Sequence, residues 1–164
     1  MSKSISKGFT LIELIIVVAI IALLASATFV AIDPAKRIGE AQNAQRWSDV
    51  TALLNGVMTY IVDNSGNFPT TLTAGDIYGI GSGSGCISAG GAETACVATA
   101  IATTACKNLA TDLVGTYLAT MPVDPASGLD YDNSGYYILR YSTGRVLVGA
   151  CNVYGSGGPI EVSR

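Results

Sequence analysis

Histidine is absent from this 164-residue sequence, and charged residues make up only 13% of it. Without histidine, the chain lacks the commonest general base and metal ligand of proteins. The sequence also has no glycine-rich phosphate loop, no Cys/His pair and no Ser/His/Asp set. These absences argue against an enzyme. We therefore expect no catalytic residue, and no cofactor apart from a possible calcium ion.

Charge is also missing from one long stretch near the N-terminus. No charged residue lies between Leu14 and Ile32, and neither proline nor glycine lies between Phe9 and Ile32. An apolar run of about 20 residues is long enough to cross a bilayer core of about 30 Å as a helix. Glu13 is the one charge between Phe9 and Ile32, and a carboxylate there is costly to ionise without a partner. A segment that only anchored the chain would not need it.

The residues in front of the apolar run are short, polar and basic. Met1 to Gly8 contains Lys3 and Lys7 and ends in glycine directly before Phe9. A secretory signal peptide is cleaved after its apolar segment, whereas here the candidate cleavage site precedes it. Because positive residues favour the cytoplasmic side, we expect the leader to stay cytoplasmic and the rest to be translocated.

These residues, Gly8-Phe9 followed by Thr10-Leu11-Ile12-Glu13-Leu14, resemble the start of type IV pilins and pseudopilins. The resemblance implies that a membrane-embedded prepilin peptidase cuts between Gly8 and Phe9 and methylates the new amine of Phe9. It further implies assembly into a filament of stacked helices. There the Glu13 carboxylate would pair with the Phe9 ammonium of a neighbouring subunit, a pairing that is favoured in a low-dielectric core.

We expect an α+β, type IV pilin-like fold in three parts: a leader (1–8), an apolar helix half (9–34) and a globular head domain (35–164). The helix should continue, with a kink or restart at Asp33-Pro34, as an amphipathic half ending near 63–66. Polar side chains, among them Arg46, should face outward. The apolar side chains predicted to pack on a small antiparallel sheet are Trp47, Val50, Leu53, Leu54, Val57, Met58, Ile61 and Val62.

The rest of the head alternates between loop and strand signals. Residues 70–105 are rich in Gly, Ala, Ser and Thr and predict a surface loop. Residues 107–120 predict a short helix that stops before Pro122. Residues 136–142 and 145–151 predict two strands joined at Thr143-Gly144, and 160–162 predict a short edge strand.

The four cysteines, Cys86, Cys96, Cys106 and Cys151, all follow the apolar segment. None forms a C-x-x-C pair, and an even number in a translocated domain favours disulfides over zinc. The flexible stretch before Cys86 favours a local Cys86–Cys96 bridge. Cys106–Cys151 would then resemble the C-terminal disulfide common in pilins. The competing pairing, Cys96–Cys106 with Cys86–Cys151, stays open.

A D-x-D-x-S-G pattern, with Asp130, Asp132 and Ser134, matches the opening of a calcium loop. Asp124 could approach from the preceding turn, and the pseudopilins that the chain resembles hold calcium in a C-terminal loop. The pattern then fails, since Tyr141 stands where a bidentate glutamate is expected. A polar turn without any ion is the alternative.

The sequence thus predicts a structural subunit that polymerises into a type IV pilus-like surface filament after leader cleavage. Expected partners are copies of itself, prepilin peptidase, the inner-membrane assembly machinery and, before assembly, the membrane, with no nucleic acid for the acidic soluble domain. The chain would be a single-pass membrane protein first and part of an extracellular filament afterwards. Alternatives are a pseudopilin of a type II secretion-like system, a minor pilin acting as adhesin or DNA-uptake module, and an anchored sensor domain.

Overall fold

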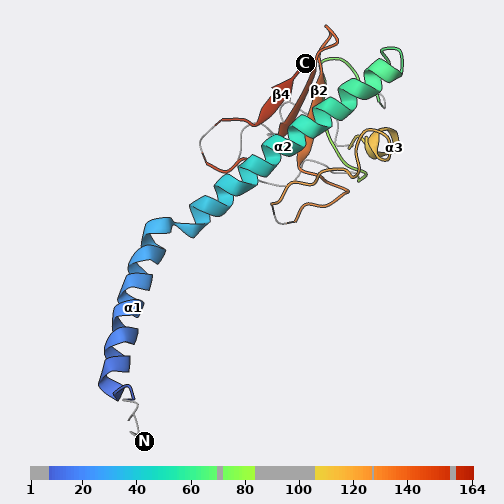
Figure 1. Cartoon of the computed structure of the whole chain (residues 1–164). Helices are drawn as coiled ribbons and strands as arrows, with labels where there is room; N and C mark the ends of the chain where they lie inside the picture. Colours follow the sequence, from blue (N-terminus) through green and yellow to red (C-terminus); the bar gives the residue numbers. More distant parts are fainter. Residues whose placement is uncertain (1–7, 70–71, 84–105, 127, 156–157) are drawn as a thin grey trace, which may run out of the picture. The chain divides into compact units, whose positions relative to one another are not determined.

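The computed structural model describes residues 8–69, 72–83, 106–126, 128–155 and 158–164, leaving aside the side chains of 30–32. The chain forms two compact units, Met1–Ile38 and Gly39–Arg164, and we call the second the head unit. Its elements, a long helix and a small antiparallel sheet, confirm the predicted α+β class (Figure 1). The predicted boundaries of leader and head domain stay predictions.

Helix α1 (Leu11–Ile32) is built mostly from aliphatic residues and begins after the N-cap Thr10. It ends at Asp33, which adopts a left-handed conformation with φ of 44°. The break follows from Pro34, because proline disfavours the helical conformation of the residue before it. The Asp33 carboxylate then accepts a bond of 3.3 Å from the amide of Lys36, as expected of the cap of a new helix.

Helix α2 (Pro34–Asp63) buries one stripe, which includes Val50, Leu53 and Val57. Two residues of the predicted stripe are instead largely exposed: Trp47 at 46% and Val62 at 75%. The expectation for Arg46 was also wrong, since its side chain is buried with 2% of its surface exposed. Helical spacing alone could not place these residues, because they lie at the edges of the stripe, where the neighbouring elements decide burial.

Helix α2 ends where the sequence predicts. The amide of Gly66 donates to the carbonyl of Ile61 at 2.8 Å, and Ser65 and Gly66 both have positive φ. A glycine with positive φ closes a helix at no steric cost. The chain therefore turns back here toward the strands.

Four strands form one antiparallel sheet in the order β1-β2-β3-β4. They are β1 (Ile77–Gly79), β2 (Tyr136–Arg140), β3 (Val146–Ala150) and β4 (Glu161–Ser163). The turn between β2 and β3 contains Gly144 with φ of 86°, as the predicted Thr143-Gly144 hairpin requires. The predicted edge strand is also present as β4.

Two expectations about the middle of the chain were wrong. Strand β1 lies within the segment predicted to be only surface loop, and the flanking side chains Leu72 and Ile80 are buried. The predicted helix over 107–120 is reduced to α3 (Ala110–Leu113), and the chain turns at Gly115, whose φ is 92°. The Gly- and Thr-rich composition around β1 gave no strand signal in the sequence. The helix over 107–120 is shorter than predicted because a glycine with positive φ ends it.

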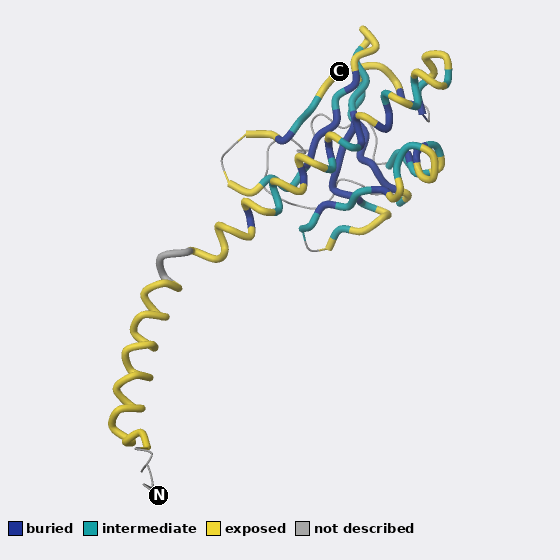
Figure 2. Tube along the Cα trace, in the orientation of Figure 1, coloured by how far each residue is buried: buried dark blue, intermediate teal, exposed yellow. Residues whose placement is uncertain are grey.

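The core of the head unit lies between α2 and one face of the sheet. Every second residue of β2 and β3 reaches this core: Tyr136, Ile138, Val146, Val148 and Ala150. Figure 2 shows α2 buried on the side toward the strands and exposed on the other. On the opposite face of the sheet, the Tyr137 ring covers Gly149 of the neighbouring strand, where a Cβ atom would overlap the ring.

Candidate processing and assembly site

Gly8 and Phe9, the predicted cleavage pair, lie in open space before α1. A Cβ atom built on Gly8 would meet nothing within 4 Å. Phe9 is 88% exposed. The chain's own packing therefore does not require a glycine at position 8. A requirement for glycine would have to come from another molecule that recognises the Gly8–Phe9 peptide bond.

Glu13, the predicted assembly residue, is held by its own helix cap. Its Oε2 atom accepts a bond of 2.9 Å from the amide of Thr10 and one of 2.8 Å from the Thr10 hydroxyl. In return, the Glu13 amide donates to Thr10 Oγ1 at 3.3 Å. This is a capping box, in which two unpaired donors at the helix start are satisfied reciprocally. Our sequence reasoning missed it, although T-x-x-E is its known signature.

Behind this cap lies a long apolar surface. Among the described residues, Leu11–Phe29 is the helix long and apolar enough to span a membrane. All of its side chains are exposed in the single chain. An apolar surface of this size is not stable in water. It must be covered by lipid or by other protein.

Comparison with protein families matches residues 3–29 to the prokaryotic N-terminal methylation motif. The chain carries the leader signature of type IV pilins and pseudopilins. The curated proteins and the solved structures gave no match. The motif fits processing by prepilin peptidase and a membrane-anchored precursor, and it points to a structural protein. Together with the α+β head unit, it supports a type IV pilin-like or pseudopilin-like protein.

Asp124, a residue of the candidate calcium set, binds an arginine in this pilin-like protein. Its two carboxylate oxygens accept bonds of 2.7 and 2.8 Å from Arg46, and both side chains are buried. The amide of Ala126 adds a bond of 2.8 Å to the same carboxylate. A buried, bidentate ion pair of this kind uses the oxygens that a metal would need.

The other candidate ligands also have partners of their own. Asp130 Oδ1 accepts bonds from the amides of Asp132 and Asn133, which is the polar turn described as the alternative. The Ser82 hydroxyl donates to the Asp132 carboxylate. Within the described ranges, no group of three or more acidic, histidine or cysteine side chains could hold a metal. The four candidate residues therefore do not fit a calcium site.

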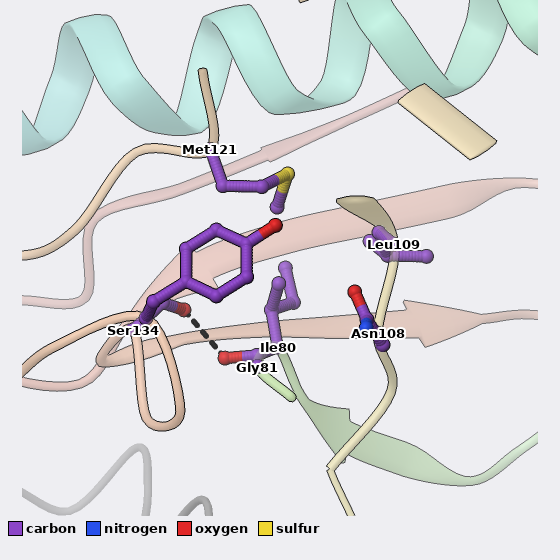
Figure 3. Close-up of a pocket in the computed structure, with 7 residues that line it drawn as sticks. Ile80, Gly81, Asn108, Leu109, Met121 and Ser134 are labelled. Carbon is purple, nitrogen blue, oxygen red and sulfur yellow. Dashed lines mark hydrogen bonds between the residues drawn. The ribbon is translucent and has the colours of Figure 1, made fainter. Parts of the chain in front are cut away.

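Ser134 points into the core. Its hydroxyl donates to the carbonyl of Ile80 at 2.6 Å (Figure 3). It lines a cavity of about 10 Å³, which is about the room that one water molecule needs. The other residues around it are Ile80, Gly81, Asn108, Leu109, Met121 and Tyr131. The cavity is too small for any larger ligand.

The structure describes two of the four cysteines, Cys106 and Cys151, and both are disulfide-bonded. Cys86 and Cys96 lie outside the described residues, so the pairing stays a prediction. The order in which neighbouring segments are hydrogen-bonded limits which cysteines can form a bridge. Residue 107 pairs beside β1, whereas Cys151 follows β3 and pairs with residue 135 beside β2. Three strand spacings amount to about 14 Å, and a disulfide joins Cα atoms less than about 7 Å apart. This order argues against a direct Cys106–Cys151 bridge and does not choose between the two pairings that link these cysteines to Cys86 and Cys96.

One network that sequence reasoning missed fixes the segment after β3 to α2. Asn43 donates to the carbonyl of Tyr154 at 2.8 Å and accepts from its amide at 2.9 Å. The same Asn43 oxygen accepts from Arg46, which links this contact to Asp124. The Tyr154 ring lies directly over Gly39, where a Cβ atom would overlap it. The side chains of α2 thus hold two distant loops of the head unit.

Proposed function

We propose that this chain is a structural subunit that polymerises into a type IV pilus-like surface filament after its leader is removed. The observation that carries the proposal is the exposed apolar surface of α1, most of which lies within the matched methylation motif. Lipid covers that surface while the chain is a membrane protein. In a filament, the same surface is covered by the α1 helices of neighbouring copies, with the head units on the outside.

Glu13 supplies the polar contact of this assembly. Cleavage before Phe9 creates an ammonium group four residues before Glu13 in the sequence. In an apolar bundle, an ammonium and a carboxylate from neighbouring copies stabilise each other, whereas either charge alone is strongly disfavoured. The pairing therefore sets the register of each incoming subunit. The capping box keeps the carboxylate hydrogen-bonded until a neighbour arrives.

Processing requires the prepilin peptidase, and assembly requires the machinery of the inner membrane. The open surroundings of Gly8 support this, because a glycine that the fold does not need suits a bond that a protease must reach. Before cleavage, the chain is a single-pass membrane protein. After assembly, the head units lie on the cell surface.

The test is mass analysis of the N-terminus of subunits in isolated filaments. We expect chains that begin at N-methylated Phe9. Gly8→Val should leave uncleaved precursor in the membrane. In the matched Gly8→Ala, whose side chain is much smaller, a larger fraction of the chains should lose the leader. Intact filaments built from chains that begin at Met1 would refute the proposal.

Pseudopilins carry the same leader signature, so the experiment includes the abundance of the chain. A main subunit should be the most abundant protein of purified surface filaments. A chain that is found only as a trace component, or only within the cell envelope, would instead be a minor pilin or a pseudopilin.

A further inference from the structure

The residues directly before α1 are extended and exposed. Thr10, the N-cap, has φ of −80° and ψ of 152°, which lies in the β region. Gly8, Phe9 and Thr10 belong to no helix or strand, and all three are exposed. The helix begins at Leu11, so the Gly8–Phe9 bond lies outside it.

The sequence around this bond contains no other strong signal that ends a helix. No proline precedes Pro34, and Gly8 weakens a helix without stopping it. The first amides of a helix have no partner within it, and an unpaired amide is costly in apolar surroundings. An uncapped α1 would therefore gain by extending toward the N-terminus, because its unpaired amides would then move into the polar leader.

The capping box stops the helix at Leu11. Thr10 Oγ1 accepts from the Glu13 amide at 3.3 Å, and the Glu13 carboxylate accepts from the Thr10 amide at 2.9 Å. A side chain caps a helix in this way from a residue whose own backbone is not helical. A capped α1 and a helical Thr10 therefore exclude each other.

The position of the helix start decides which backbone groups are free. The Leu14 amide donates to the Thr10 carbonyl at 3.3 Å, which is the first bond of the capped helix. If the helix extended past the cap, the Gly8 carbonyl would accept from the Ile12 amide, by the regular i to i+4 spacing. A protease cleaves a structured segment through its open form. An extended α1 would thus withdraw the Gly8–Phe9 bond from cleavage.

We propose that Thr10 is a positioning residue for leader cleavage, because its cap keeps the Gly8–Phe9 bond outside α1. This inference rests on the proposed function, which assigns cleavage to that bond. Thr10 acts through the conformation of the backbone and not by contact with the peptidase. Cleavage then has two requirements in this chain: a residue without a side chain before the bond, and a helix that begins after it.

The test is the kinetics with which purified prepilin peptidase removes the leader from the full-length precursor in mixed detergent micelles. A helix that covers the bond withdraws substrate without altering the chemistry, which raises the apparent KM and leaves kcat unchanged. Thr10→Val keeps the shape of the side chain but removes the cap, so the apparent KM should rise roughly two- to fivefold. Thr10→Asn changes the shape but keeps a cap, and its KM should equal that of the unaltered chain.

A control variant and a direct measurement of the helix start accompany the kinetics. Thr28→Val makes the same substitution within α1, where the hydroxyl donates to the Ala25 carbonyl, and it should leave the KM unchanged. Isotope-labelled phenylalanine reports on Phe9, with the helical Phe29 as reference. The Cα chemical shift of Phe9 should move toward the helical value in Thr10→Val and stay unchanged in Thr10→Asn. Kinetics are the readout because slower processing still reaches completion during growth.

The outcomes separate this proposal from the proposed function. An unchanged KM or an unchanged Phe9 shift in Thr10→Val would overturn the positioning role. A raised KM or a lowered kcat in Thr10→Asn would also overturn it, because the peptidase would then recognise the threonine itself. All three results leave the filament function standing, provided that the unaltered chain is cleaved at Gly8–Phe9. Absence of that cleavage would overturn both.

Discussion

At the scale of single residues, Glu13 has one partner in the single chain and another in the proposed filament. In the single chain, its carboxylate is bonded to the amide and the hydroxyl of Thr10. An N-cap of this kind contributes about 1 kcal/mol to a helix. The ion pair with a neighbouring ammonium needs the negative charge, whereas the cap needs only a hydrogen-bond acceptor. The two roles can therefore be separated by substitution.

We predict that Glu13→Gln keeps the helix and membrane insertion but assembles poorly, because the amide oxygen can still accept from Thr10 while the charge is gone. Glu13→Ala should assemble equally poorly. Thr10→Val removes only the cap hydroxyl and should keep most of the filament yield. Yield is measured by shearing and quantifying filaments, with membrane fractionation as the control for insertion. A normal yield from Glu13→Gln would show that the charge has no role in register.

Arg46 is the second residue whose role can be tested by substitution, since its charge is paired with that of Asp124. Removal of one member of a buried ion pair typically costs about 3–5 kcal/mol, because the other charge stays buried and unpaired. We predict this loss for Arg46→Ala and for Asp124→Asn, measured by thermal unfolding of the full chain in detergent. The double variant Arg46→Met/Asp124→Leu should recover much of the stability. Equal stability of Arg46→Ala and the unaltered chain would contradict the buried pairing.

At the scale of elements, the packing of α2 on β2 is fixed by a tyrosine. The Tyr136 hydroxyl donates to the Asp49 carboxylate at 2.7 Å, and the ring is fully buried. Burial first, and then the bond to Asp49, raise the pKa of Tyr136 well above its usual value. Burial and the bond to Glu161 raise the pKa of Tyr137 in the same direction. The folded state therefore favours the neutral phenols.

This gives a prediction for alkaline pH. The pKa values of Tyr136 and Tyr137 in the folded state lie above the unfolded value of about 10. The stabilisation that their neutral phenols contribute is therefore fully present below about pH 10 and is lost as the pH rises above it. We expect the denaturation midpoint of the full chain to fall steeply above pH 10. Tyr136→Phe should be less stable than the unaltered chain at pH 7, by about 1–3 kcal/mol because Asp49 loses its donor, but should fall less steeply with pH. The exposed Tyr131→Phe serves as the control, and an unchanged slope in Tyr136→Phe would contradict this assignment.

At the scale of the whole molecule, we predict that disulfides connect the loop-rich middle of the chain to the sheet. Cys106 precedes the residue that pairs with β1, and Cys151 follows β3 directly. Because β1 and β2 lie between these positions, we predict that non-reducing peptide mapping joins neither cysteine to the other. Each should instead be linked to Cys86 or Cys96. A peptide that joins Cys106 to Cys151 would contradict the strand order. Reduction should lower the unfolding free energy by about 2–5 kcal/mol.

Several features of this protein could be predicted from its sequence, because they depend on interactions between residues close together in the chain. The basic leader, the uncharged run behind Glu13, the proline after Asp33 and the Thr143-Gly144 turn each act within a few residues. They determine the apolar helix α1, the helix break and the β2–β3 hairpin, all of which the structure has. The motif that identifies the chain as pilin-like is likewise confined to residues 3–29.

Contacts between distant residues decided the rest. Arg46 is buried, against its expected place on a polar face, because Asp124 lies opposite it, 78 residues further along the chain. The same pairing removes Asp124 from the calcium set. Strand β1 exists because β2 supplies its hydrogen bonds, which the Gly-rich composition around it does not reveal. Trp47 follows the helical spacing of the core but lies at its edge, where the stripe is no longer covered. Periodicity tells which residues share a face, whereas only the folded chain shows what covers that face.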